Sequence, residues 1–248
     1  MAPSVTTLFG GAMLFVGGII LLVSGRYVWR ATAVLRATEV DALADRASNA
    51  LVRVSGTVSR ETEDILVAPF SGVECVAVRY QIEERRLSTL YLLPWYVTVR
   101  EGTGAVEFAV QSAVGTVPVV EPVRTVVLQN EVVETVRADE DPSERVREFE
   151  RSKGASESTV WQTPPSVLAP LFRFLSLGAR RYSEQRAARG AEITVVGRVT
   201  DDGAGLDPIV VSDRAPMATV LRMAKTSIAG LCIGGVGVLL GYVVLFLG

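Results

Sequence analysis

The chain has 248 residues, 49% of them apolar, and a formal net charge of −2. A net charge this small and negative provides no overall positive potential that would attract nucleic acid, so we expect no nucleic-acid partner. Histidine is absent and the only cysteines are Cys75 and Cys232, so a tetrahedral zinc site could not be closed without carboxylates. We therefore expect neither a metal site nor a cofactor.

Uncharged segments stand near both ends of the chain. Residues 2–25 and 226–248 contain no charged side chain, and each exceeds the ~20 apolar residues that a helix needs to cross a bilayer. A buried core helix is the alternative, which the length and the lack of charge disfavour. We predict transmembrane helices in residues 1–30 and 226–248, with a soluble domain at 31–225.

The charges beside these segments predict an orientation. Basic residues flank both segments on the side of the intervening domain: Arg26, Arg30, Arg36, Arg214, Arg222 and Lys225. A secretory signal peptide has its positive charge before the apolar run, not after it. The positive-inside rule therefore predicts a cytoplasmic domain, with both termini outside.

The second apolar segment contains glycines at helical spacing. They are Gly230, Gly234, Gly237 and Gly241. Small residues on one stripe let two helices approach closely in lipid. The stripe could face the first segment, where Gly10, Gly11, Gly17 and Gly18 are available, or a second copy of the chain in a homo-oligomer.

The domain begins with a predicted helix over 31–50, because Val40, Leu43, Ala44 and Ala47 share one face. Alternation of apolar and polar residues between Gly or Pro turns then predicts strands at 51–58, 64–68, 73–84, 95–100, 104–111, 115–120, 123–130, 132–137, 191–200 and 207–212. Short strands at regular spacing are typical of a small barrel or sandwich.

Further helices are predicted at 137–154, with Asp141 as a cap, and at 164–190, where Pro170 starts or kinks the helix. The later part of 164–190 carries Arg180, Arg181, Arg186 and Arg189. These arginines form either a solvated face or a contact with anionic lipid or phosphate. The predicted fold class is a membrane protein in which two transmembrane helices flank a β-rich α+β domain, a small barrel or sandwich with added helices.

Cys75 is the only thiol in the predicted soluble domain. In the strand 73–84 it shares a face with Val73 and Ala77, which is largely apolar. No histidine is available to activate the thiol, and no neighbouring cation in the sequence lowers its pKa. We interpret Cys75 as a packing residue rather than a nucleophile.

Other candidates for acid–base chemistry are weak. Glu83 and Glu84 are adjacent, so a strand directs them to opposite faces. Asp201 and Asp202 fall in a hairpin turn at 201–205, where Asp is favoured by the backbone alone. Lys225 stands at a membrane edge, where it acts as a snorkelling anchor rather than as the base of a Ser–Lys dyad. We expect no catalytic residues.

Three motifs support a family resemblance. The segment APFSGVECVAVRYQIEE, residues 68–84, resembles the core of the GIDE-type domain, also called the domain beside a membrane. Residues 108–122 and 180–199 resemble two later motifs of that family. The matching positions are Pro69, Gly72, Cys75, Tyr80, Phe108, Gly115, Val119, Pro122, Arg180, Arg181, Tyr182, Glu184, Gly190, Val195 and Gly197. The resemblance extends over the whole chain, because the family also places this domain between two spans.

The resemblance implies membrane-linked functions. The GIDE-type domain occurs in mitochondrial RING-type ubiquitin ligases, where it is not the catalytic part. This sequence departs from the ligases: it ends at Gly248 without RING zinc ligands, and Gln111, Ser112 and Ala113 replace an acidic residue. Its flanking charges also predict a cytoplasmic domain, whereas the ligases place theirs in the intermembrane space.

Three functions remain open from the sequence. The first is a non-catalytic scaffold or interaction module for an unknown protein partner. The second is a ubiquitin-ligase-like component of a ubiquitin-like modifier pathway, with a separate subunit supplying the chemistry. The third is a lipid or small-ligand sensor that uses the face from Arg180 to Arg189.

Overall fold

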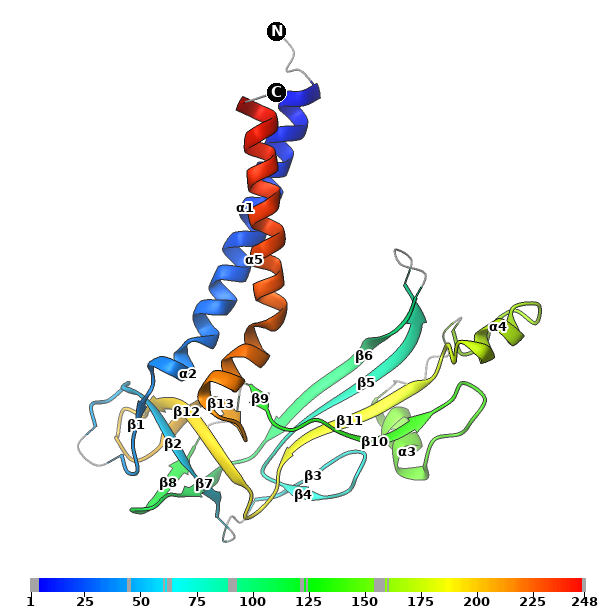
Figure 1. Cartoon of the computed structure of the whole chain (residues 1–248). Helices are drawn as coiled ribbons and strands as arrows, with labels where there is room; N and C mark the ends of the chain where they lie inside the picture. The colour runs from blue at the N-terminus through cyan, green and yellow to red at the C-terminus, as the bar shows by residue number, and fades with distance from the viewer. Residues whose placement is uncertain are drawn as a thin grey trace. The chain divides into compact units, whose positions relative to one another are not determined.

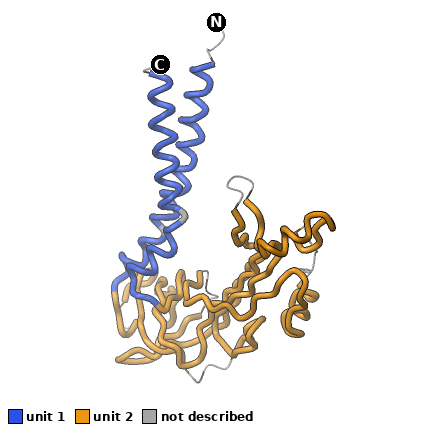
Figure 2. The backbone as a smooth tube through the Cα atoms, turned by 45° about the vertical axis from the view of Figure 1, so that its right-hand side comes forward, with its two compact units in different colours: residues 1–38, 214–248 blue, residues 39–213 orange. Residues whose placement is uncertain are grey.

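The computed structural model describes residues 5–43, 46–59, 61, 64–88, 93–120, 123, 125–153, 159 and 161–246. The chain divides into two compact units (Figure 2). Unit 1 contains residues 1–38 and 214–248, and unit 2 contains residues 39–213. The β-rich unit is therefore inserted in sequence between two helical segments.

Unit 1 consists of α1 (Val5–Ala31), the short α2 (Ala33–Arg36) and α5 (Pro216–Phe246). The long helices α1 and α5 pack side by side (Figure 1). The segments Val5–Arg36 and Ser227–Phe246 are long and apolar enough to cross a membrane. The presence of two such helices at the ends of the described chain is confirmed, although α5 starts before residue 226.

The glycine stripe of α5 lies against α1. Its members are Gly230, Gly234, Gly237 and Gly241. A Cβ on Gly234 would stand 3.0 Å from the carbonyl oxygen of Gly17, and a Cβ on Gly241 would stand 2.9 Å from that of Gly10. Contacts that short require the absence of a side chain. Of the two partners left open by the sequence, this structure shows the stripe on the first segment.

The first part of unit 2 is a closed barrel of five strands. The strands are β2 (Leu51–Val58), β7 (Phe108–Gln111), β8 (Thr116–Val119), β12 (Glu192–Val199) and β13 (Leu206–Ser212). The order is β2-β12-β13-β8-β7, and β7 pairs back to β2. Only the β8–β13 contact is parallel among these pairs. This is the connectivity of a Greek-key barrel of the OB type, a fold that by itself assigns no function.

The barrel is filled by β-branched side chains. Val54, Val110 and Val195 are among those with no exposed surface, as expected where such residues pack on a pleated face. Gly197 lies at a register shift between β12 and β13. A Cβ there would stand 2.3 Å from the carbonyl oxygen of Asp207, so only glycine permits this strand approach.

The second part of unit 2 is an antiparallel four-stranded sheet. Its order is β10-β11-β5-β6, formed by β10 (Glu131–Val136), β11 (Arg180–Ala187), β5 (Ala77–Leu87) and β6 (Pro94–Ala105). The strand pairs come from the segments between β2 and β7 and between β8 and β12. The described remainder comprises β1 (Thr38–Glu39), β3 (Leu66–Val67), β4 (Glu74–Cys75), β9 (Val126–Val127), α3 (Glu144–Lys153) and α4 (Ala169–Phe174).

The α+β class and the barrel are confirmed, and the strands predicted at 51–58, 191–200 and 207–212 are observed as β2, β12 and β13. Other boundaries were shifted. The strand 73–84 is interrupted at Val76, and the strands 95–100 and 104–111 are redivided as β6 and β7. Among the described residues of 123–130, only Val126–Val127 form a strand, and the helix predicted at 137–154 begins at Glu144.

Two predicted helices were wrong over most of their length. The helix 31–50 ends at Arg36, because Val40 and Leu43 bury in the barrel core instead of sharing a helix face. The helix 164–190 is reduced to α4, and residues 180–187 form the strand β11. Ala44 of the first prediction and Pro122 of the family motif lie outside the described residues.

Candidate functional site

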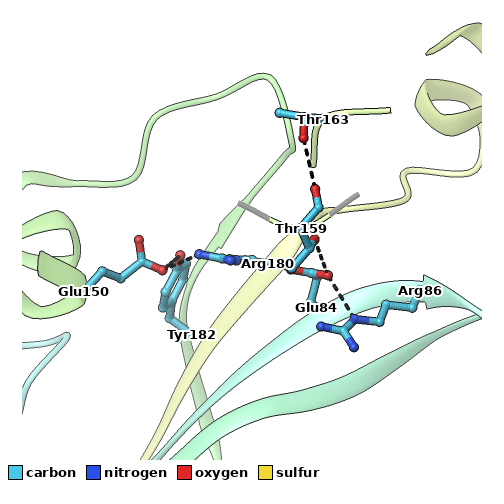
Figure 3. Close-up of polar contacts among 7 residues, drawn as sticks. All are labelled: Glu84, Arg86, Glu150, Thr159, Thr163, Arg180 and Tyr182. Carbon is cyan, nitrogen blue, oxygen red and sulfur yellow. Dashed lines mark hydrogen bonds and ion pairs between the residues drawn. The ribbon is translucent and has the colours of Figure 1, made fainter. Parts of the chain in front are cut away.

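A buried charge network joins β5, β11 and α3 (Figure 3). Arg180 Nη1 lies 2.8 Å from Glu150 Oε1, and Arg180 Nε lies 3.4 Å from Glu84 Oε2. The Glu84 side chain is fully buried, and those of Arg180 and Glu150 retain 8% exposure. One guanidinium therefore compensates two buried carboxylates, which is the arrangement that makes burial of such charges tolerable.

Hydrogen bonds complete this network. The Tyr182 hydroxyl donates to Glu150 Oε1 at 2.8 Å, and Arg86 Nε donates to Glu84 Oε1 at 2.9 Å. Burial and the neighbouring Glu150 raise the pKa of Tyr182 well above its ordinary range, so its hydroxyl stays a donor. Burial is the largest single influence on the pKa of Arg180 and lowers it, but Glu150, Tyr182 and Glu84 together outweigh burial and the net pKa is raised.

Glu184, one of the motif positions, holds the turn at Pro69–Gly72. Its Oε1 accepts from the Phe70 amide at 2.5 Å, and its Oε2 accepts from the Ser71 hydroxyl at 2.6 Å. The turn closes through the Gly72 amide, which donates to the Ala68 carbonyl at 3.0 Å. Gly72 has φ +74°, which favours glycine. Motif residues separated by more than 100 positions thus form one structural unit.

Aromatic rings pack between this turn and the sheet. Phe70 meets Tyr80, Phe149 and Tyr182 edge to face, with centroid distances of 5.8, 5.2 and 5.4 Å. Val146 of α3 is fully buried in the same cluster. The aromatic cluster explains why Tyr80 and Tyr182 occur in the motifs: both anchor α3 and the turn on the sheet.

Cys75 is fully buried in a small cluster with Ala68 and Val78. Burial, followed by the nearby Glu184 charge, raises the pKa of its thiol from 9.0 to about 11, and Arg186 offsets this in part. A thiol that stays protonated at neutral pH is a poor nucleophile and a poor metal ligand. Its position agrees with the packing role inferred from the sequence. Among the described residues, no group of three or more His, Cys, Asp or Glu side chains could hold a metal ion.

The proposed arginine face does not exist as a helical surface. Arg180 is buried in the charge network, and the Arg181 guanidinium lies 3.8 Å from the ring centroid of Tyr96. Arg186 Nη2 lies 2.5 Å from Glu131 Oε2. The predicted helical face was therefore wrong, because residues 180–187 form a strand in which Arg180, Arg181 and Arg186 each have a partner within the protein. The sensing role attached to this face stays a hypothesis.

The remaining motif positions lie in the barrel or beside it. Phe108 is in the barrel core, Gly115 precedes β8, and Gly197 is at the β12–β13 approach. Gly190 has φ +74° in the turn that leads from β11 to β12. The motifs therefore meet in two places: the turn, thiol and aromatic cluster on the sheet, and the strand contacts of the barrel.

A pocket lies next to the charge network, and sequence reasoning missed it. Its volume is about 190 Å³, and its lining includes Trp161, Phe172, Leu177, Arg137, Asp139 and Arg173. The rings of Trp161 and Phe172 stack with centroids 5.7 Å apart. The pocket is therefore lined by apolar side chains together with charged side chains of both signs.

The network positions the pocket wall. Thr159 Oγ1 donates to Glu84 Oε1 at 2.9 Å, and the Thr159 carbonyl accepts from the Gln162 amide at 3.0 Å. Gly178 has φ +79°, and a Cβ there would stand 2.2 Å from the carbonyl oxygen of Trp161. The hydrogen bond between Thr159 and Glu84 and the close approach at Gly178 therefore fix the backbone position of Trp161.

The sequence contained weak signals for these missed residues. Glu150 stands four residues after Val146, so an acidic residue shares the buried face of α3. A carboxylate on an apolar helix face predicts a buried cation partner. Trp161 is an isolated aromatic residue in a mostly polar stretch of the sequence, residues 154–163. No family model, curated protein or solved structure matches the chain.

Proposed function

We propose that the chain is a two-pass membrane protein whose unit 2 is a non-catalytic module that binds a protein partner at the membrane surface. The observation that carries the proposal is the pocket lined by the stacked rings of Trp161 and Phe172. The neighbouring charge network has a structural role, because Arg180, Glu84 and Glu150 compensate one another away from solvent.

The size of the pocket favours a protein over a free small ligand. Sites for small molecules and cofactors typically enclose ~300–1,000 Å³, whereas this pocket encloses about 190 Å³. That volume suits a single apolar or aromatic side chain. Interface anchors of this kind are inserted into well-packed pockets and carry much of the binding energy. Arg137, Asp139 and Arg173 would then contact polar groups around the anchor.

The family resemblance supports the same class of function. In the ligases that carry a GIDE-type domain, the domain stands beside the membrane and is not the catalytic part. A ubiquitin-ligase-like role for this chain rests on that resemblance alone, and the geometry adds nothing to it. The flanking charges favour cytoplasmic placement of unit 2, which protection of an Ala204→Cys label in intact cells would test.

A photo-crosslinking amino acid in place of Gln162, which lines the pocket, tests the proposal in cells. We expect a discrete adduct with one protein. The matched control places the same residue at Val114, which is exposed and distant in sequence from the pocket. Equal labelling at both positions, or no adduct at Gln162, would remove the proposed binding site.

A further inference from the structure

One end of the four-stranded sheet exposes large apolar side chains, a set we call the apolar end. Its members are Leu93, Trp95, Val167, Leu168, Leu171 and Phe174. Val167 and Phe174 are 87% and 84% exposed. Single exposed apolar residues are normal on a surface, but a group of six at one end of a sheet indicates an interaction site.

The members are brought together by the strand register. Arg180 pairs with Glu84, and β5 ends three residues later, so α4 and the β5–β6 hairpin lie at the same end of the sheet (Figure 1). The Gly178 amide donates to the Arg85 carbonyl at 2.8 Å, and the Arg85 backbone amide donates to the Ala179 carbonyl at 2.8 Å. These bonds hold the segment after α4 against the hairpin.

Helix α4 has two different faces. Phe172 and Ala169 line the pocket, whereas Leu168, Leu171 and Phe174 recur at spacings of three and are exposed. None of the residues of α4 is buried. Exposed apolar side chains on so short a helix indicate that this face contacts something other than water.

The charge pattern around α4 favours a lipid surface. Between Ser158 and Ala179 the sequence contains one charged residue, the exposed Arg173, and no carboxylate. The acidic neighbour Asp139 lines the pocket together with Arg173, on the other face of α4. A helix with aromatic and aliphatic side chains on one face and Arg on the other is typical of segments that lie in the headgroup region. Trp95 adds a ring of the kind enriched at membrane–water interfaces.

The chain also keeps unit 2 close to a bilayer. The first candidate span runs to Arg36 and unit 2 begins at Glu39. On the other side, α5 starts at Pro216 and the second candidate span starts at Ser227, which corresponds to ~16 Å of helix. A unit of this length has a radius of gyration of ~16 Å. A lipid surface is therefore always within reach, at high effective concentration.

We propose that the apolar end inserts into the headgroup region of the same membrane that the two helices span. Unit 2 would then have a third, peripheral contact with the bilayer, supplied by α4 and the β5–β6 hairpin. The inference does not depend on the pocket having a protein partner, because the exposed face of α4 is not the face that lines the pocket.

The test uses the full chain with Cys75→Ala and Cys232→Ala, reconstituted at one copy per lipid nanodisc. A polarity-sensitive fluorophore is attached at Phe174→Cys or, as the matched control, at Val114→Cys, which is 72% exposed in unit 2. Nitroxide-labelled lipid should quench the Phe174 label about threefold more than the Val114 label, with blue-shifted emission. Leu171→Glu should abolish that difference.

Three results would overturn the proposal. Water-like emission and equal quenching at both positions would show that α4 stays in solvent. Shielding at Phe174 without lipid quenching, seen only at two copies per disc, would assign the apolar end to a second copy of the chain. Shielding that requires added cell extract would assign it to a protein partner.

Discussion

Arg180 Nη1 and Glu150 Oε1 lie 2.8 Å apart and link the first residue of β11 to α3. The same guanidinium contacts Glu84, so its removal takes the paired cation from the buried Glu150 and leaves Glu84 with Arg86 alone. Breaking a buried pair in this way typically costs ~3–5 kcal/mol. This contact therefore connects the stability of unit 2 to the arrangement of its candidate site.

Arg180→Met should lower the free energy of unfolding by ~3–5 kcal/mol, measured by urea denaturation of the full chain in detergent. Arg147→Met is the control, because Arg147 forms exposed pairs with Asp141 and Glu144, and exposed pairs contribute ~0–1 kcal/mol. If Arg180→Met and Arg147→Met lowered the free energy of unfolding by similar amounts, the buried network would contribute no more to stability than exposed ion pairs do.

Glu184→Gln should loosen the turn at Pro69–Gly72. The amide can still accept one hydrogen bond, but it loses the charge that receives bonds from Phe70 and Ser71, at a cost of ~1–3 kcal/mol. Hydrogen exchange at the Phe70 amide should accelerate. Glu192→Gln, at an exposed residue of β12, should leave that exchange rate unchanged. Unaltered protection of Phe70 in Glu184→Gln would contradict this role.

The thiol of Cys75 predicts a pH dependence at alkaline pH. Its pKa is about 11 in the folded chain, against an ordinary value of 9.0, so the unfolded chain loses this proton first. Stability should be unaffected below pH 9 and should fall as pH rises from 9 towards 11, by at most ~2–3 kcal/mol. Cys75→Ala should remove that part of the slope. Parallel unfolding curves for both chains across this range would show that the thiol is not buried as described.

Gly241→Ala should weaken the packing of α1 on α5. A Cβ at Gly241 would stand 2.8 Å from the Leu14 amide nitrogen and 2.9 Å from the Gly10 carbonyl oxygen, whereas a Cβ at Gly235 would meet nothing within 4 Å. Gly241→Ala should therefore lower disulfide formation between cysteines placed across α1 and α5, and Gly235→Ala should not. Equal cross-linking in both variants would place the stripe elsewhere, for example on a second copy.

The sequence correctly predicted strands of which one face is buried, because apolar and polar residues alternate along them. Strand β2 alternates because its inner residues fill the barrel, and the DDGAG turn between β12 and β13 is specified locally. Strand β11 was missed because its residues are buried on both faces, with no alternation between buried and exposed positions, and both of its edges pair with β10 and β5. Its Arg, Glu and Gln residues favour a helix in isolation, and tertiary ion pairs override that preference.

The candidate site was less predictable than the fold. The motif residues identified the turn, Tyr182 and Glu184, but not the partners that come from distant segments, such as Glu150 and Thr159. The pocket depends on the ring stack of Trp161 and Phe172, which requires Gly178 to accept a close backbone approach. Spacing in one sequence does not encode which distant loop approaches a given glycine.

The most direct test of the binding-module proposal is to fill the pocket. Ala138 lines it and is exposed, so Ala138→Trp should fill the pocket beside the Trp161–Phe172 stack without disturbing the core. Ala204→Trp, in the exposed β12–β13 turn, is the matched control. The amount of adduct formed in cells by the crosslinker at Gln162 is then measured. We predict that Ala138→Trp abolishes the adduct and that Ala204→Trp retains it; an adduct that survives in both would contradict recognition through this pocket.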